Sequence, residues 1–413
     1  MLNYQSLPGQ DPELWQLIQA EQQRQAEELE LIASENYTSP AVLEAMATVL
    51  ANKYSEGYPS KRYYGGNQII DQVEALCIER AKQLFSAEHV NVQPLSGSPA
   101  NMAIYLALLK PGDTIMGLKL DHGGHLSHGH PVNFSGKLFN FVQYEVGADG
   151  YLNLEQLKQM ALVEKPKMIL AGYSAYSREI PWQAIQDIAT AIGAITVADI
   201  SHTAGLIAGQ QLTNPVPIFD VVMTTTHKTL RGPRGAIIMC QAKYAKDIDK
   251  GVFPGLQGGP HEHIIAAKAV ALAEALQPSF VDYAKQIITN AQAMAKEFVA
   301  LGYTVLSGGT DTHLLVIDLQ NKKLIGKTVE TTLESIGVSI SRSTVPNDPQ
   351  PPYNPSGIRL GTPAITTRGF QAKDCVELAK IIDQAIINRD DSQQLNNLKQ
   401  KVKGLCTQHP LPY

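Results

Sequence analysis

The sequence predicts an α/β protein with a mostly parallel sheet between helices, followed by a smaller α+β unit. Short apolar runs rich in β-branched residues alternate with helical patterns between residues 111 and 240. That alternation is typical of βαβ units. Strands are expected at Ile115–Leu120, Met168–Ala171, Ile195–Asp199, Val221–Thr225 and Ala236–Met239, and helices at Met102–Leu109, Leu154–Leu162 and Trp182–Ile192.

Domain boundaries follow from length and pattern. A chain of 413 residues exceeds one ordinary core. We expect a helical arm at residues 1–50, which begins with an Asp11-Pro12 cap and packs on another domain or subunit. A large domain at 51–277 and a small one at 278–413 follow. The small domain is expected to contain a helix from Pro278 to Leu301, strands at Thr304–Leu306, His313–Leu319, Val338–Ser341 and Ile358–Gly361, helices at Thr328–Ile336, Cys375–Ile387 and from Gln393, and a proline-rich loop at Val345–Pro355.

Composition excludes several classes of protein. The net charge of −5 gives no electrostatic reason to expect nucleic acid or an anionic membrane as a partner. Four scattered cysteines form no Cys-x-x-Cys pair, which argues against a disulfide framework or a zinc site. The N-terminus is acidic and no run is apolar enough to span a bilayer. A cytoplasmic location is expected.

Lys228 lies in the segment Thr224–Arg234, just beyond an expected strand, where α/β folds place their ligands. A buried amine with a lowered pKa can attack a carbonyl and form a Schiff base. His227, Arg231 and Arg234 could supply the neighbouring cations that lower it. The alternative is a surface lysine, which is the commoner state of a lone Lys.

Ser96-Gly97-Ser98 precedes a helix, and free N–H groups at a helix N-terminus bind anions. An ordinary serine cap is the alternative. Asp199 ends an expected strand, with His202 close behind, and a carboxylate there needs a positive partner. An anion cup, an acid and a Schiff-base lysine together are what pyridoxal phosphate requires.

Two further stretches carry candidate functional residues. The aromatic, glycine-rich loop from Tyr54 to Gly66 either lines a site or covers the surface. His122, His125, His128 and His130 could form a metal site, but two glycines and a single acidic neighbour, Asp121, argue against one. Gly326-Lys327-Thr328 ends like a P-loop without its first glycine and is rejected.

The sequence also resembles the serine hydroxymethyltransferase family over nearly its whole length. The resemblance is carried by Leu31–Tyr37, Tyr58-Pro59, Arg62–Gly66, Gly123–Leu126, Thr226–Leu230, Gly258–Pro260 and Gly361–Ala364. It implies the aspartate-aminotransferase-like fold, which is fold type I of pyridoxal-phosphate enzymes, with a seven-stranded sheet in the large domain. It also implies a homodimer with shared active sites, with a tetramer as the alternative assembly.

The resemblance implies roles for individual residues. Lys228 would form the Schiff base, Asp199 would keep the pyridine nitrogen protonated, His125 would stack on the ring, and Ser174 and His202 would meet its phenolic oxygen. The remaining cofactor contacts would be Ser96, Gly97, Ser98, Thr225 and His227, with Tyr54, Gly258 and Gly259 from a second subunit. Substrate contacts would be Arg359 and Ser34 on the carboxylate, Tyr64 and the proton-handling Glu56 from the second subunit, and Leu120, Gly124, Leu126 and Ser343 toward folate.

The implied reaction transfers the hydroxymethyl carbon of serine to tetrahydrofolate, giving glycine and 5,10-methylenetetrahydrofolate. Leu95 and Ser343 depart from the family pattern at positions that bear on folate affinity and amino-acid preference. The alternatives on the same scaffold are a folate-independent aldolase of threonine-like amino acids and an α-methylserine hydroxymethyltransferase. A non-catalytic binding protein and a histidine-based metal hydrolase are alternatives from other classes.

Overall fold

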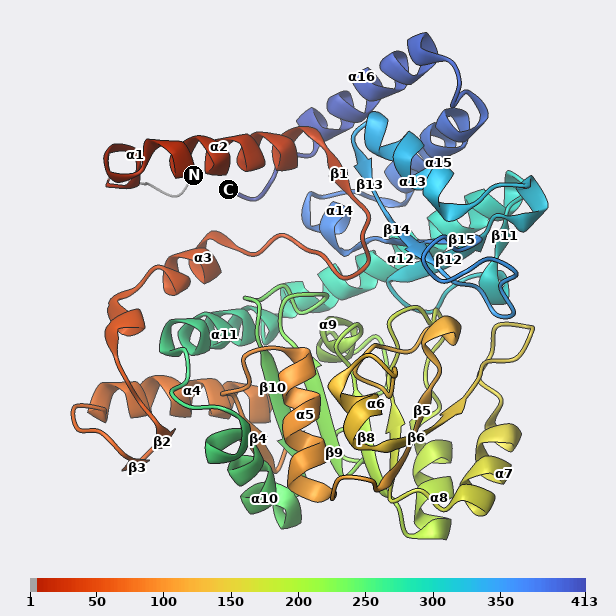
Figure 1. Ribbon diagram of the computed structural model, residues 1–413. Coiled ribbons are helices and arrows are strands. Elements are labelled where there is room, and N and C mark those ends of the chain that lie inside the picture. Colours follow the sequence, from red (N-terminus) through yellow and green to blue (C-terminus); the bar gives the residue numbers. More distant parts are fainter. Residues whose placement is uncertain (1–5) are drawn as a thin grey trace. The chain divides into compact units, whose positions relative to one another are not determined.

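A computed structural model describes residues 6–413 of the chain (Figure 1). The chain forms two compact units. One contains residues 41–285 and the other joins residues 6–40 to residues 286–413, so the division falls within helix α12 (Pro278–Ala300). Residues 6–40 therefore belong to the same unit as the C-terminal part of the chain.

The larger unit is built on a seven-stranded sheet, which agrees with the α/β fold class predicted from the sequence. In spatial order its strands are β4 (His89–Asn91), β10 (Ala236–Cys240), β9 (Val221–Thr225), β8 (Ile195–Asp199), β7 (Met168–Ala171), β5 (Thr114–Leu118) and β6 (Asn140–Tyr144). Neighbouring strands are parallel except at β10, which is antiparallel to both β9 and β4.

Both faces of this sheet are buried, because alternate residues of each strand point to opposite sides. On β9, Val222 packs in the cluster that includes α4, α7, α8 and α11. Its neighbours Val221 and Met223 pack with α5 and α10 on the other face. The helices of this unit are α3 (Pro40–Met46), α4 (Gln68–Phe85), α5 (Gly97–Leu108), α6 (Phe134–Leu138), α7 (Leu154–Glu164), α8 (Trp182–Ile192), α9 (Ala204–Ala208), α10 (Ala245–Lys250) and α11 (Glu262–Ala275). A small hairpin of β2 (Gly57–Tyr58) and β3 (Lys61–Arg62) completes it.

The smaller unit contains an antiparallel sheet in the order β11 (Thr304–Val305), β12 (Leu314–Asp318), β15 (Gly357–Gly361), β14 (Ser341–Ser343). Its helices are α1 (Leu7–Gln10), α2 (Pro12–Glu27), α13 (Gly326–Ser335), α14 (Pro363–Thr367), α15 (Ala372–Ile387) and α16 (Ser392–Gln408). Residues 6–40 of the N-terminal arm pack in this unit. Its strand β1 (Leu29–Glu30) pairs with β13 (Val338–Ser339), and Leu29 is fully buried in the core of this unit.

Several predicted boundaries are wrong. The strand expected at Ile115–Leu120 ends at Leu118, and Leu120 belongs to a short turn. The helix expected from Met102 begins at Gly97. The single strand expected at Val338–Ser341 is two strands in different sheets. Among the described residues, no single helix is long and apolar enough to cross a membrane; only α11 and α12, bent by 84°, pass that test together.

Arg368 ties the arm to the last helix within the smaller unit. Its guanidinium donates to the carbonyls of Gln25 and Glu28 at the end of α2, and to those of Cys406 and His409 at the end of α16, over 2.7–3.1 Å. Carbonyls in the last turn of a helix lack intrahelical partners, so one buried cation satisfies two helix ends.

Replacing Arg368 by Met should lower the free energy of unfolding by at least about 1–3 kcal/mol, the cost of leaving a buried acceptor unsatisfied. Urea unfolding followed by circular dichroism measures the change. Arg389→Met is the matched control. Arg389 is a partly exposed arginine that donates to one carbonyl, that of Ile386, over 3.1 Å and lies 3.8 Å from the exposed Asp390, and surface pairs contribute about 0–1 kcal/mol. Equal effects of the two substitutions would contradict this role for Arg368.

Candidate active site

Strands β8 and β9 end side by side and place Asp199 and Thr225 at the same edge of the sheet. Ser201 joins the two strand ends. Its backbone N–H donates to Oδ1 of Asp199 over 3.1 Å, and its Oγ accepts from the N–H of Thr225 over 3.0 Å. The third strand end, after β7, comes close at Gly172, where a Cβ atom would lie 2.7 Å from the Cβ of Asp199. Three strand ends thus meet at one residue, Asp199.

The carboxylate of Asp199 is almost fully buried and is stabilised as an anion. Burial alone would raise its pKa, but His128 donates to Oδ2 over 3.2 Å and, with the nearby His125 and Ser201, shifts the pKa well below the usual range. Asn101 donates to the same oxygen over 3.1 Å. Asp199 therefore stays ionised at neutral pH and could pair with a buried cation at the strand end.

His128, Asn101 and Ser127 are site residues that the sequence interpretation missed. The hydroxyl of Ser127 accepts from Asn101 over 3.0 Å and lies 2.7 Å from Nδ1 of His125. His125, Ser127, Asn101 and Asp199 therefore form one chain of hydrogen bonds, and His128 binds Asp199 separately. From the sequence, His128 is a candidate only as a metal ligand. Asn101, a fully buried amide on an otherwise apolar helix, was the sequence signal that could have indicated this network.

Lys228 follows β9 in a tightly closed loop, and its side chain is only 9% exposed. Thr226 closes the loop, because its N–H donates to Gly235 and its carbonyl accepts from the N–H of Gly232. Thr229, directly after Lys228, donates to the carbonyl of His202 over 2.8 Å. The loop that carries the lysine is therefore fixed to the loop that carries His202.

The proposed source of positive charge beside Lys228 needs a correction. Burial, with Arg234 and Lys228 adding to it, lowers the pKa of His227 to about 3. His227 is therefore neutral at physiological pH and supplies no cation. Arg231 faces Glu274, 3.8 Å away, and lies over the ring of Tyr283. Arg234 is the remaining one of the three expected cations.

The Ser96-Gly97-Ser98 turn lies against the same strand end. Ser96 is the extended residue before α5, and Gly97 and Ser98 form the first turn of that helix. A Cβ atom on Gly97 would lie 2.8 Å from Cγ2 of Thr225, so only glycine allows this approach. The helix N-terminus is thereby held beside β9, as an anion site near Lys228 requires.

The loops after β5 and β7 are joined to each other. The N–H of Ser174 donates to the carbonyl of Gly123 over 2.7 Å. Gly124 turns back on β5 and donates to Lys119, while Leu126 is 45% exposed. The predicted ring contacts Ser174 and His125 and the predicted folate contacts Leu120, Gly124 and Leu126 therefore lie on two linked loops.

Tyr54, Glu56, Tyr64, Gly258 and Gly259 form a second cluster in the larger unit. The rings of Tyr54 and Tyr64 meet edge to face at 5.3 Å. A Cβ atom on Gly258 would lie 3.2 Å from Oε1 of Glu56, and one on Gly259 would lie 3.2 Å from the ring of Tyr54. Tyr54 and Tyr64 are 57% and 49% exposed. These are the same residues that were expected to be lent to a neighbouring subunit.

A buried polar network supports the loop that carries Glu56. Ser55 donates to Oε1 of Glu262 over 2.5 Å, and Arg62 donates to the carbonyls of Ser55 and Gly57. Arg62 also pairs with the buried Glu74 at 2.7 Å. Burial raises the pKa of Glu262 to about 7, although the Ser55 hydroxyl lowers it in part.

Arg359, Ser34 and Ser343 belong to the smaller unit. Arg359 lies on β15 and donates to Oγ of Ser341 over 3.1 Å. Burial lowers its pKa to about 10, so the guanidinium remains charged at neutral pH. The segment before Ser34 runs along the end of β15, since the N–H of Gly361 donates to Leu31. Ser343 is buried at the end of β14.

The histidines at 122–130 serve different purposes. His128 pairs with Asp199, whereas His122 faces Glu145 at 3.7 Å. Across residues 6–413, no group of three or more His, Cys, Asp or Glu side chains is arranged to hold a metal ion.

Comparison with known proteins gives a consistent result. The family model described as serine hydroxymethyltransferase matches residues 7–382. Two curated relatives are named serine hydroxymethyltransferase. The protein from Desulfotalea psychrophila is 52% identical over 98% of this chain and 96% of its own length, and the one from Alkalilimnicola ehrlichii is 53% identical over 97% and 96%.

Glu262 predicts a pH dependence of stability. Its folded-state pKa, about 7, exceeds the value of 4.5 expected without burial, so the folded state binds the proton more tightly. Its contribution is therefore fully present below pH 4.5 and is lost as the pH rises through 7. Glu262→Gln should remove this loss, which amounts to about 2–3 kcal/mol between pH 5 and 8.

Urea unfolding at several pH values measures this dependence. Glu164→Gln, at an exposed position on α7, is the control and should retain the wild-type pH profile. The assignment fails if Glu262→Gln and wild type lose stability in parallel from pH 5 to 8.

Proposed function

The chain belongs to the serine hydroxymethyltransferase family, and from this premise we propose how its residues carry out the reaction. The enzyme reversibly transfers the hydroxymethyl carbon of serine to tetrahydrofolate, giving glycine and 5,10-methylenetetrahydrofolate. Its cofactor is pyridoxal phosphate, which supplies an electron sink for cleavage of the Cα–Cβ bond. The observation that carries the assignment of the site is the ionised, largely buried Asp199, on the strand next to the one that leads into the loop of Lys228.

The residues at the sheet edge fit this cofactor in three respects. The lowered pKa of Asp199 suits a carboxylate that keeps a pyridine nitrogen protonated. The first turn of α5, at Gly97 and Ser98, offers free N–H groups to a phosphate. Lys228 is an almost buried amine on a closed loop. The strand before it, β9, lies between β8, which ends at Asp199, and β4, which leads to the α5 turn, so the amine can engage the cofactor aldehyde.

The other residues orient and protect the reacting groups. His128, Asn101 and Ser201 hold the Asp199 carboxylate in one orientation. Ser127 fixes the ring of His125 through Nδ1, which suits a histidine that stacks on a flat cofactor. His227 is neutral and so adds no positive charge next to Lys228. Thr225 and His202 are held at the same sheet edge by hydrogen bonds, Thr225 to Ser201 and His202 to Thr229.

A second copy of the chain completes the site in this proposal. Tyr54, Glu56, Tyr64, Gly258 and Gly259 lie together, and both tyrosine rings are about half exposed. Arg62 and Glu262 hold the loop of this cluster through hydrogen bonds to Ser55 and Gly57. A cluster of aromatic side chains with a carboxylate is suited to covering a site on a partner. Glu56 would then handle the proton of the serine hydroxyl. The mass in solution distinguishes a dimer from a tetramer.

We also propose a contact for the amino-acid carboxylate, the contacts for tetrahydrofolate and a location in the cell. Arg359, helped by Ser34, binds the carboxylate of the amino acid as a charged, bidentate partner. Leu120, Gly124, Leu126 and Ser343 receive tetrahydrofolate. A cytoplasmic location is supported by the four cysteines, all unpaired and buried.

The direct test of the function is serine turnover with and without tetrahydrofolate. Wild-type protein should form glycine from serine much faster when tetrahydrofolate is present, and Lys228→Ala should abolish both turnover and the absorbance band of the Schiff base between Lys228 and the cofactor. Lys243→Ala, at an exposed lysine paired with Asp220, is the control and should keep both. Turnover of serine that ignores tetrahydrofolate would favour the aldolase, and near-normal rates for Lys228→Ala would refute the assigned lysine.

Arg359→Ala should raise the KM for serine by a factor equivalent to about 2–5 kcal/mol, with a smaller change in kcat, because a charged carboxylate partner is lost. Steady-state kinetics at saturating tetrahydrofolate measure it. Arg342→Ala is the control, since Arg342 on the adjacent strand is held by Glu330 and the carbonyl of Tyr353. Unchanged serine binding in Arg359→Ala would show that the carboxylate binds elsewhere.

A further inference from the structure

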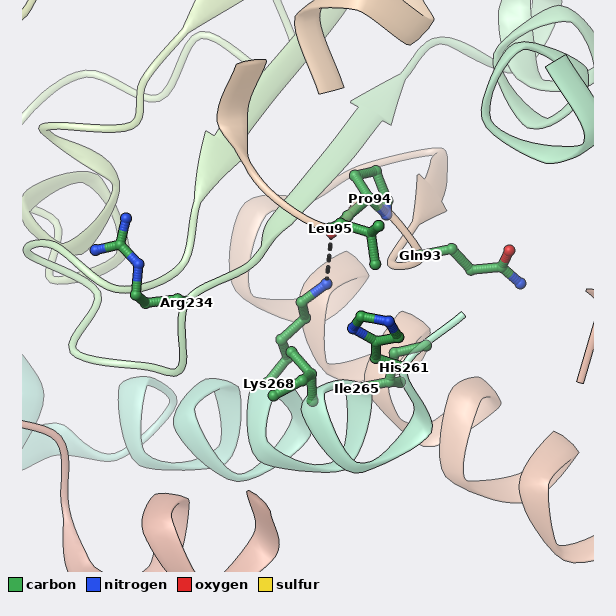
Figure 2. A pocket seen from close by; sticks show the side chains of 8 residues that line it. Gln93, Pro94, Leu95, Arg234, His261, Ile265 and Lys268 are labelled. Atoms are coloured by element: carbon green, nitrogen blue, oxygen red, sulfur yellow. Dashed lines mark hydrogen bonds between the residues drawn. The ribbon is translucent and has the colours of Figure 1, made fainter. Parts of the chain in front are cut away.

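Lys268 is a fully buried lysine in the middle of helix α11, only 1% exposed. Its ammonium group donates to three backbone carbonyls, those of Val92 at 2.7 Å, Pro94 at 3.0 Å and Ala236 at 2.9 Å. Figure 2 shows the side chain rising from the helix to Pro94. An ammonium group has three N–H donors, so each one is used.

The three carbonyls belong to the two segments that carry opposite ends of the proposed cofactor site. Val92 and Pro94 lead directly into the Ser96-Gly97-Ser98 turn. Ala236 begins β10 and follows the closed loop Thr226–Gly235, which carries Lys228. The segments also meet through the N–H of Ala236, which donates to Pro94 over 3.2 Å. Lys268 therefore bridges the two segments.

The side chain of Lys268 is also closely packed against the Lys228 loop. A Cβ atom on Gly235 would lie 2.4 Å from Cε and 3.2 Å from Nζ of Lys268, so the loop presses directly on the side chain. The pocket beside it has a volume of about 20 Å³, and polar side chains of Gln93, Arg234 and His261 line it with Lys268 (Figure 2). None of the eight residues lining that pocket is acidic.

A charge in this position is costly, and burial lowers the pKa of Lys268 to about 8. An apolar side chain of the same length would fill the space at lower cost but could not hold three carbonyls at one point. We propose that Lys268 is a positioning residue that fixes the Ser96–Ser98 turn relative to the Lys228 loop, and so sets the affinity for the cofactor. This inference rests on the proposed function of that turn and loop.

The test is cofactor binding rather than turnover. Lys268→Met keeps the length of the side chain and removes the three donors. Equilibrium dialysis against pyridoxal phosphate should show a dissociation constant raised about 10- to 100-fold, because small displacements of binding groups have effects of that size. Once saturated with cofactor, the variant should keep a wild-type KM for serine.

Leu272→Ala is the matched control. It removes buried apolar volume one turn further along the same helix, so it should destabilise the protein without changing cofactor affinity. Wild-type affinity in Lys268→Met, or an equal loss of affinity in both variants at equal stability, would overturn the proposal. Lys228→Ala separates this result from the proposed function, since near-normal serine turnover by Lys228→Ala would disprove the site itself.

Two further variants keep the test decisive if Lys268→Met does not fold. Lys268→Ala leaves three carbonyls around a space where an ammonium ion can bind, so ammonium chloride, but not tetramethylammonium chloride, should restore cofactor affinity. Gly235→Ala should displace the lysine and weaken cofactor binding on its own, and should add little in the Lys268→Ala background. Failure of ammonium to restore affinity, together with additive effects of the two substitutions, would overturn the role of Lys268.

Discussion

The site depends on one buried negative charge, the carboxylate of Asp199 at the end of β8. A buried carboxylate is unfavourable unless hydrogen bonds compensate for the lost hydration. Here His128, Asn101 and the N–H of Ser201 provide that compensation. Each partner comes from a different loop or helix, so the charge also draws the loop after β5, the start of α5 and the end of β8 together.

The sheet makes this convergence possible. Parallel strands buried on both faces present their carboxyl ends at one edge, and the loops that follow carry Ser174, His202 and Lys228. Hydrogen bonds between loops then fix them in pairs, Gly123 with Ser174 and Thr229 with His202. The edge is thereby a rigid surface, as a cofactor held at several points requires.

The sequence predicted the interior of this fold better than its margins. The central strands β7, β8 and β9 were placed correctly because their apolar runs are continuous, which is what burial on both faces requires. The edge strands β4 and β6 were missed because they are short or carry exposed polar residues. The helix α11 was missed as well, since its apolar residues surround it without a clear polar stripe.

The same distinction holds for the site. Lys228 and Asp199 could be found from the sequence because each follows a recognisable strand. The partners of Asp199 could not, because His128 and Asn101 are distant in sequence and become its neighbours only through the chain's folding. The charge of His227 could not be predicted either, since its pKa is set by burial and by Arg234 rather than by residue type.

Helix α11 carries two buried ionisable residues, Glu262 and Lys268, close to the site. It buries Glu262 beneath the loop of Glu56 and Lys268 beneath the segment before Ser96. The two groups do not form an ion pair with each other; each is hydrogen-bonded to uncharged partners instead, and burial shifts the pKa of both toward the neutral form. A helix selected for stability alone would carry apolar side chains at both positions. Both polar groups hold a loop of the larger unit in place: Glu262 binds the loop that carries Glu56, and Lys268 binds the segment before Ser96.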